Sequence, residues 1–257
     1  MEIRIGTSGY SFEDWRGNFY PAQIDKGKML DFYQAHFNTV EVNSTYYRIP
    51  HPAVLNNMAK KTKPGFEFII KANQNLTHQR REIEQPTKEF LQAIQPIVDR
   101  GQLKGILAQF PYSFKFSTAN LAYIVTCGEL LAPHPLFVEF RHDGWMRPQT
   151  YQTLKNQGIS YVSVDGPRLQ GLLPPELVTT TDTAYIRLHG RNAEHWWSGG
   201  SQRYDYLYNE TELREWQEKI GRISEEARKT FIFFNNCHLG QAVKNARQMM
   251  QMLKLQF

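Results

Sequence analysis

Residues 105–141 read GILAQFPYSFKFSTANLAYIVTCGELLAPHPLFVEFR, and this stretch shows the unit from which the chain is built. Its two ends, Gly105–Phe110 and Leu136–Arg141, are short apolar runs typical of buried β-strands. Between them, Ala119–Leu131 places apolar residues at helical intervals. A strand, a helix and a second strand in this order predict two parallel strands joined by a right-handed crossover.

The same alternation extends in both directions along the 257 residues. Further β-type runs are Glu2–Ser8, Thr39–Asn43, Phe66–Lys71, Ser160–Asp165, Ala184–His189 and Thr230–Asn235. Helical spacing recurs over Lys28–Phe37, Lys88–Val98, Tyr151–Gln157, Glu212–Ala227 and the last segment, Ala242–Leu253. About eight strands and about seven helices predict a TIM-type (β/α)8 barrel with a parallel eight-stranded sheet, rather than a doubly wound sheet.

No break in composition divides the chain, so we expect one domain over residues 1–257. Two connections depart from the regular pattern. The sixth, Gly166–Thr183, holds three prolines and no clear helix, and the seventh, Gly190–Asn209, is long and aromatic. The barrel prediction therefore includes an irregular sixth connection and a long seventh loop.

The composition limits the kinds of protein that this chain can be. A hydrophobic fraction of 41% and an aromatic fraction of 13% exclude a disordered chain, and Cys127 and Cys237 exclude a disulfide-built miniprotein. The net charge of +5 permits an anionic partner without requiring one. No signal peptide or apolar run of about 20 residues is found, so we expect a cytoplasmic protein without membrane contact.

Strand parity predicts where the polar side chains gather. Barrel strands alternate their side chains between lumen and helix layer, and the active sites of TIM barrels lie at the carboxyl ends of the strands. The inward residues expected at those ends are Ser8, Glu41, Asn43, Lys71, Gln109, Glu139, Arg141, Asp165, Arg187, His189 and Asn235. Burying so many polar groups costs free energy unless they are paired. The ring therefore indicates a site, although a structural ion-pair network of Glu41, Glu139, Arg141 and Arg187 is the alternative.

Several motifs identify a family at this point. They are Gly6-Thr7-Ser8-Gly9-Tyr10, Val40-Glu41-Val42-Asn43-Ser44-Thr45-Tyr46-Tyr47-Arg48, Gln109-Phe110-Pro111, Glu139-Phe140-Arg141-His142, Arg187-Leu188-His189-Gly190 and Phe234-Asn235-Asn236. With these blocks the chain resembles the YecE-like family, domain of unknown function 72, over nearly its whole length. The resemblance implies a TIM-barrel-like fold and no settled activity. The chain departs from the family pattern at Met58, where Trp is common, and at Tyr10 and Tyr46, which replace the commoner Trp and Phe.

The expected mouth residues suggest roles in acid–base chemistry on a small anionic or polar substrate. Glu139 and Asp165 are the candidate acids and bases, with His189 as a proton shuttle. Lys71, Arg141 and Arg187 are candidates for an anion clamp. The remaining predicted substrate-binding residues are Ser8, Tyr10, Glu41, Asn43, Tyr47, Gln109, Trp197 and Asn235. The glycines of Trp196-Trp197-Ser198-Gly199-Gly200 suggest a mobile lid.

A metal site is the first alternative to metal-independent chemistry. Glu139, Asp165 and His189 come from three neighbouring strands, and carboxylates with imidazole do bind divalent ions. Against this, Lys71, Arg141 and Arg187 place positive charge in the same region, and no motif with metal-ligand spacing is present. We therefore expect no metal and no cofactor.

Two functions follow from the sequence. The first is a metal-independent enzyme, with hydrolase, lyase and isomerase all open. The alternative is a protein that binds or processes nucleic acid, because Lys60-Lys61, Lys63 and Arg80-Arg81 form basic clusters and aromatic residues surround the mouth. Ordinary solvated faces explain such clusters equally well, and no dense basic stripe is present.

Overall fold

Parallel strands form one nearly closed, barrel-shaped sheet in the structure, a computed structural model that describes residues 1–198, 200–223 and 225–255. Within those ranges the strands are β1 (Glu2–Thr7), β2 (Thr39–Val42), β3 (Glu67–Lys71), β4 (Leu103–Gln109), β5 (Leu136–Glu139), β6 (Ser160–Asp165), β7 (Thr183–Leu188) and β8 (Lys229–Phe234). Their order is β1-β8-β7-β6-β5-β4-β3-β2, with parallel ladders between neighbours. The predicted TIM-type barrel is confirmed.

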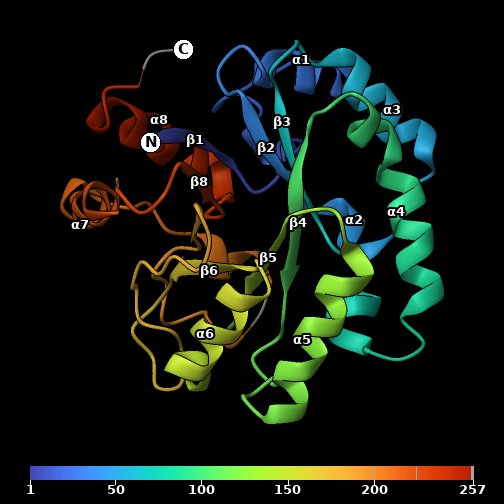
Figure 1. Ribbon diagram of the computed structural model, residues 1–257. Helices are drawn as coiled ribbons and strands as arrows, with labels where there is room; N and C mark the ends of the chain where they lie inside the picture. Colours follow the sequence, from blue (N-terminus) through green and yellow to red (C-terminus); the bar gives the residue numbers. More distant parts are fainter. Residues whose placement is uncertain (199, 224, 256–257) are drawn as a thin grey trace.

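Helices follow the strands and pack outside the sheet (Figure 1). The described α-helices are α1 (Met29–Tyr33), α2 (Ser44–Tyr47), α3 (Pro52–Lys61), α4 (Glu84–Asp99), α5 (Thr118–Leu131), α6 (Pro148–Asn156), α7 (Glu210–Arg222) and α8 (Gln241–Met252). In the part of the chain that the structure covers, none of these helices has the length and apolarity needed to cross a membrane.

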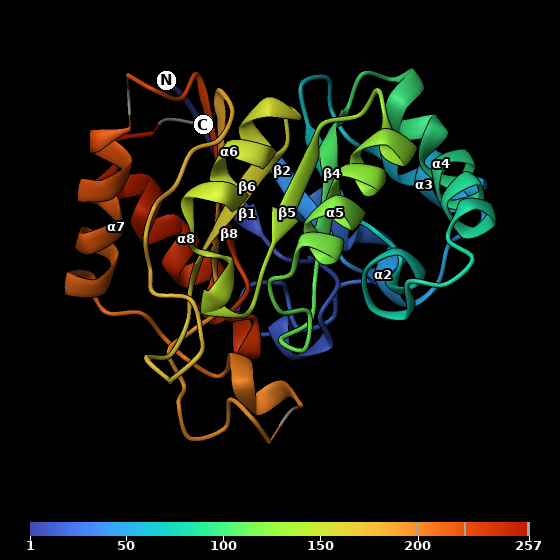
Figure 2. The ribbon, with the colours of Figure 1, turned by 60° about the horizontal axis from the view of Figure 1, so that its bottom comes forward.

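Both irregular connections are present as expected. Residues 166–182, all of them described, run from β6 to β7 without a helix. The seventh connection leaves β7 and extends below the barrel before α7 begins (Figure 2). The side chain of Asn209 accepts a hydrogen bond from the backbone of Glu212, and Glu212 bonds back to the backbone of Asn209. This capping box fixes the start of α7, which ends at Arg222 rather than at Ala227.

Closure of the barrel between β1 and β2 depends on a few contacts. Ser8 and Glu41 form an isolated parallel bridge, and Gly9 N donates to the Glu41 carbonyl at 2.8 Å. Further down, the Tyr33 hydroxyl accepts from Thr7 N at 3.0 Å and donates to the Thr39 carbonyl at 3.2 Å. The phenol from α1 therefore joins two strands whose backbones are not paired at this level.

Aromatic rings fill the lumen beneath the mouth. Phe137 stacks on Tyr185 with ring centroids 4.8 Å apart, and Phe231 and Phe233 lie beside Tyr185. All four side chains are buried. Because such a layer excludes water, charged groups placed directly above it must be neutralised by one another.

Tyr33→Phe should lower the free energy of unfolding by about 1–3 kcal/mol, because it leaves the buried Thr7 N–H without a partner. Urea denaturation measures the difference. Tyr47→Phe is the matched control, since Tyr47 is 74% exposed and its hydroxyl donates no hydrogen bond to a described residue. Equal stability of Tyr33→Phe and wild type would contradict the bridging role.

Candidate functional site

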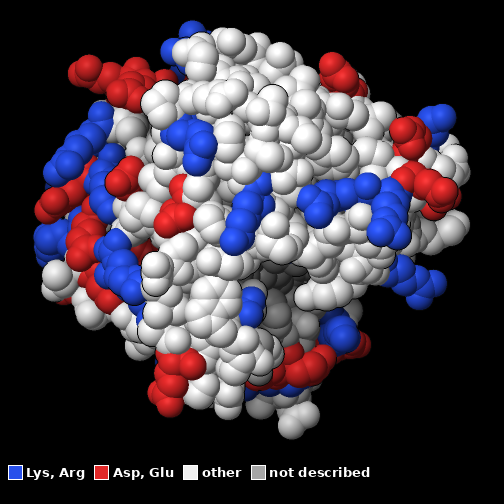
Figure 3. All heavy atoms as spheres, turned by 90° about the horizontal axis from the view of Figure 1, so that it is seen from below, with Lys and Arg blue, Asp and Glu red and all other residues white. Residues whose placement is uncertain are grey.

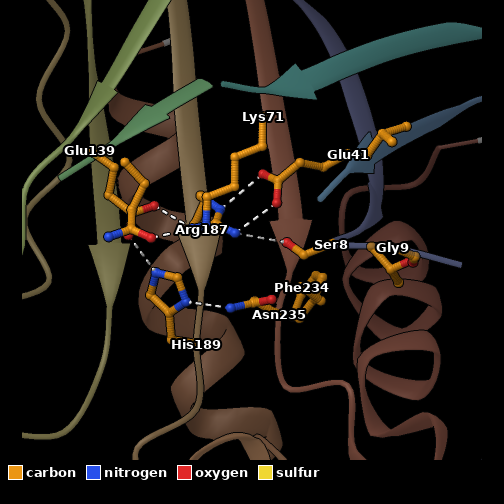
Figure 4. A network of polar contacts seen from close by, with 12 residues as sticks. Ser8, Gly9, Glu41, Lys71, Glu139, Arg187, His189, Phe234 and Asn235 are labelled. Atoms are coloured by element: carbon orange, nitrogen blue, oxygen red, sulfur yellow. Dashed lines mark hydrogen bonds and ion pairs between the residues drawn. The ribbon is translucent and has the colours of Figure 1, made fainter. Parts of the chain in front are cut away.

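Arg187 occupies the centre of the barrel mouth, between two carboxylates from other strands (Figure 4). It points into the lumen, on the same face of the sheet as its register partners Val164 on β6 and Phe233 on β8. Its Nε and Nη2 donate to the two oxygens of Glu41 at 2.9 and 2.7 Å, and Nη1 donates to Glu139 Oε2. All three side chains are buried.

Glu139 has two further neighbours. Arg141 Nε lies 2.7 Å from Glu139 Oε1 in an ion pair, and His189 Nε2 lies 3.2 Å from the same oxygen. On the other side of the imidazole, Asn235 Nδ2 donates to His189 Nδ1 at 2.8 Å. These contacts place the imidazole proton on Nε2, directed at the carboxylate, with both ring nitrogens occupied.

The charges of this network are fixed by their mutual contacts. Burial would raise the pKa of Glu41 and of Glu139, but Arg187 lowers the first, and Arg141 with Arg187 holds the second well below its usual range. Burial, reinforced by Arg141, lowers the pKa of His189 to about 3. Both carboxylates are therefore ionised near neutral pH, and His189 is neutral.

Lys71 approaches the same centre from the end of β3. Its Nζ donates to Gln109 Oε1 at 2.9 Å and lies 4.5 Å from the centre of the Tyr46 ring. Among the described residues, no carboxylate lies within 4.0 Å of this nitrogen. Burial, together with the charge of Arg187, lowers the pKa of Lys71 to about 7, although Glu139 and Glu41 oppose the shift.

A cleft of two lobes opens above these residues. The first lobe, of about 350 Å³, is bordered by the loops after β1, β2 and β8, and the second, of about 310 Å³, by those after β3, β4 and β7. Lys71, Arg141, Tyr47 and Tyr204 line both lobes. Seen from the side to which β4 points in Figure 1, the surface is hollowed near its centre, with Lys or Arg atoms at the rim (Figure 3).

Most residues predicted to bind substrate line this cleft. Ser8, Tyr10, Asn43, Arg187 and Asn235 face the first lobe, and Gln109 and Trp197 the second. Glu41 lies beneath the cleft instead, because both of its carboxylate oxygens are bonded to Arg187. The sequence thus located the walls of the cleft, while the binding roles of these residues stay predictions.

Asp165 does not lie in the lumen, and the parity expected for β6 is wrong. Asp165 pairs in register with Leu188, whereas Val164 pairs with the inward Arg187. Its carboxylate accepts from Arg191, Tyr208 and Trp216 at 2.7–2.9 Å on the helix side of the sheet. These partners come from the seventh connection and α7, so Asp165 anchors that segment and does not line the cleft.

Ser163 has the same corrected orientation. Its Oγ accepts from Val178 N at 2.9 Å in the sixth connection. The buried polar side chains on the helix side of β6 therefore form hydrogen bonds to the two irregular connections. These connections lack a regular helix at the points of contact.

The remaining residues predicted at the mouth lie at different depths relative to the cleft. Trp197 is 54% exposed and meets the Tyr112 ring edge-on, with centroids 4.9 Å apart, while Trp196 is buried. Gly199 lies outside the described residues, so the lid hypothesis stays a prediction. Glu139 and His189 lie below the cleft and do not appear among its lining residues.

Several residues of the site escaped sequence reasoning, and three of them bear on its chemistry. Tyr112 and Arg203 line the second lobe, and the Tyr185 hydroxyl donates to Glu41 Oε2 from below. Tyr112 follows β4, and a loop after a barrel strand always lies at the mouth, so position alone signals it. Arg203 lies in the long connection after β7, so the same positional argument applies to it.

Within the described ranges, no three His, Cys, Asp or Glu side chains gather in an arrangement that could hold a metal ion. Of the proposed set, Glu139 and His189 are in contact, but Asp165 faces the opposite side of the sheet. These three residues therefore do not form the ligand cluster that the sequence left open.

Comparisons with known proteins give a consistent result. The profile of the family described as "Protein of unknown function DUF72" matches residues 4–257. The chain is 32% identical over 273 residues to the UPF0759 protein YunF of Bacillus subtilis (strain 168), covering 99% of this chain and 96% of YunF. It is also 34% identical over 73 residues to the UPF0759 protein YecE of Escherichia coli (strain K12), 28% of this chain and 27% of YecE.

Two solved structures share the fold closely. A DUF72 family protein from Thermotoga maritima MSB8 matches with a TM-score of 0.92 at 42% identity, covering 99% of this chain and 100% of that chain. A DUF72 family protein from Enterococcus faecalis V583 matches with a TM-score of 0.89 at 27% identity, covering 99% and 96%.

Arg187→Met should lower the free energy of unfolding at neutral pH by about 3–5 kcal/mol, because it leaves two buried carboxylates without their shared cation. Urea denaturation measures the loss. Arg222→Met, at an exposed position at the end of α7, is the control and should stay close to wild type.

The loss should also depend on pH. Glu41 and Glu139 have lower pKa values in the folded protein than in the unfolded chain, so their ionisation stabilises the fold above pH 4.5, the unfolded value. That contribution to stability is lost as the pH falls from 4.5 through the lower pKa values that Glu41 and Glu139 have in the folded protein. The stability gap between wild type and Arg187→Met should therefore narrow below about pH 4.5. A gap that stays constant on acidification would contradict the ion-pair assignment.

Proposed function

The chain belongs to the DUF72 family of proteins of unknown function, as its motifs indicated, and we propose that this member is an enzyme that binds a small anionic or polar substrate at the barrel mouth. In this proposal it transfers protons there without a metal ion. Lys71 carries the proton, and Arg141 contacts the anionic group of the substrate.

The observation that carries the proposal is an imbalance of charge. Arg187, Arg141 and Lys71 are three basic side chains at this end of the lumen, and they face the two carboxylates of Glu41 and Glu139. Arginine keeps its charge under all ordinary conditions, so the lysine is the member that gives up its proton. A bound anion would supply the missing negative charge and favour the protonated amine.

Arg141 is suited to meet that anion. Its Nε is ion-paired with Glu139 Oε1 at 2.7 Å but does not have the geometry of a hydrogen bond, and its Nη groups make no hydrogen bond to any residue that the structure describes. The side chain is 12% exposed and lines both lobes of the cleft. A guanidinium with two unoccupied donors in a partly dry cleft matches the geometry of a carboxylate or phosphate.

We assign proton transfer to Lys71 instead of Glu139, Asp165 and His189, the residues that the sequence favoured. Glu139 is held ionised by two arginines, and His189 has a pKa of about 3 with both nitrogens engaged. We therefore assign both to positioning Arg187 and Arg141. A single amine that removes and returns a proton suits lyase or isomerase chemistry better than hydrolysis, which needs a positioned water as well.

Nucleic-acid binding stays a prediction from the sequence. Lys60, Lys61 and Lys63 precede β3, whereas Arg80 and Arg81 follow it, so the two clusters lie at opposite ends of that strand.

Inorganic phosphate should bind the wild-type protein, and Arg141→Gln should weaken this binding about tenfold or more, because a charge-assisted contact is lost. Isothermal titration calorimetry measures both affinities. Arg81→Gln is the control, since Arg81 is exposed and does not line the cleft. The absence of phosphate binding, or an Arg141→Gln affinity equal to wild type, would refute the proposal.

The affinity should fall as the pH rises through about 7, because Lys71 then loses the proton that attracts the anion. Lys71→Met should weaken binding and remove this pH dependence. Calorimetry over a pH series measures the slope, which must be corrected for the ionisation of phosphate by comparison with sulfate. An unchanged slope in Lys71→Met would assign the titration to another group.

A further inference from the structure

We propose that the Lys71 amine forms an imine with an aldehyde or ketone substrate whose anionic group is bound by Arg141. The inference rests on the function proposed above and narrows its substrate class to carbonyl compounds that carry a phosphate or carboxylate.

The first support is the environment of the amine. Lys229, at the start of β8, is neutralised by the carboxylate of Glu67 at 2.6 Å. Lys71 instead donates to the neutral amide of Gln109. An amine that donates one hydrogen to an amide oxygen keeps its lone pair available, whereas an amine in a salt bridge is protonated and cannot attack a carbonyl carbon.

The second support is the arrangement of charges around Lys71. Arg187 on β7 and Arg141 after β5 disfavour the ammonium form, and the opposing carboxylates of Glu139 and Glu41 are already shared with those arginines. The remaining neighbours, Tyr46 and His78, are uncharged near neutral pH, because burial and the charge of Lys71 lower the pKa of His78 to about 4. The neutral form of the Lys71 amine is therefore accessible near neutral pH, unlike that of an exposed lysine.

The third support is space. Lys71 and Arg141 stand together on the wall common to the two lobes, which have volumes of about 350 and 310 Å³. One small molecule could then place its carbonyl carbon at Lys71 and its anionic group at Arg141. The rest of that molecule would lie in either of the two lobes. Aromatic side chains, Tyr46, Tyr112 and Trp197 among them, border the second lobe.

The chemistry balances without an external oxidant or reductant. The amine lone pair forms a C–N bond to the carbonyl carbon, and the carbonyl oxygen leaves as water with the two hydrogens of the amine. Protonation of the imine nitrogen gives a cation that the anionic group of the substrate neutralises. This cation withdraws electrons from the adjacent carbon, which is the activation that imine-forming lyases and isomerases of carbonyl compounds use.

Pyridoxal 5′-phosphate is the probe, because it carries an aldehyde and a phosphate. The wild-type protein is mixed with it at pH 7, treated with sodium borohydride, which reduces an imine to a stable secondary amine, and mapped by peptide mass spectrometry. Lys71 should be labelled at least about tenfold faster than the exposed Lys60 and Lys88, because an ordinary lysine with a pKa near 10.4 is almost wholly protonated at pH 7.

Two controls isolate the anion contact. Inorganic phosphate should slow the labelling of Lys71 but not that of Lys60, and pyridoxal, which lacks the phosphate, should label Lys71 more slowly. Lys71→Arg should take no label at position 71 while it still binds phosphate in calorimetry, because the positive charge is retained.

The possible outcomes separate the two proposals. If phosphate binds but Lys71 is labelled no faster than Lys60, the imine is refuted and the anion-binding function stands. If phosphate does not bind and Lys71 is not labelled, both fall. If Lys71 reacts equally fast with pyridoxal and is not protected by phosphate, the anionic substrate class is wrong. Selective, phosphate-protected labelling supports the imine.

Discussion

The ion pairs of Arg187 are the constraint on which the barrel mouth depends. This side chain on β7 holds Glu41 from β2 and Glu139 from β5, and all three side chains are buried. An isolated buried charge costs several kcal/mol, so each of these residues is tolerated only because the others are present. The aromatic layer around Tyr185 closes the lumen below them and adds a hydrogen bond to Glu41. These contacts hold the carboxyl ends of β2, β5 and β7 in fixed positions relative to one another.

The same pairs determine the properties of the cleft above. Glu41 is bonded to Arg187, and Glu139 is shared between Arg187 and Arg141. Lys71 therefore has no carboxylate of its own, and burial lowers its pKa to about 7. This arrangement of three basic groups and two carboxylates, with a lysine whose pKa is about 7, is the basis on which we propose that the cleft binds an anion. The proposed chemistry follows from this single arrangement of charges, and within that proposal Glu139 and His189 position Arg187 and Arg141.

The sequence predicted the barrel and much of this site because both follow from periodicity. Strand alternation placed Arg187, Glu41 and Glu139 inward, and parallel order brought their ends to one mouth. It failed for Asp165, because β6 carries polar residues on both faces and only the partners Arg191 and Trp216, far along the chain, show which face is outward. The neutrality of His189 and the role of Tyr33 between β1 and β2 also depend on contacts distant in sequence. The local alternation of polar and apolar residues does not predict contacts of this kind.

The titration of Lys71 tests the central claim most directly. The chemical shift of its ε-methylene carbon, followed by NMR over a pH series in protein labelled with ¹³C-lysine and assigned with Lys71→Arg, reports the protonation of this amine. The charge arrangement predicts a midpoint near pH 7 and a rise of that midpoint when phosphate is added. A midpoint near pH 10.4, as for an exposed lysine, would contradict the account. It would show that the ammonium form of Lys71 is stabilised despite the ion pairs that occupy Glu41 and Glu139.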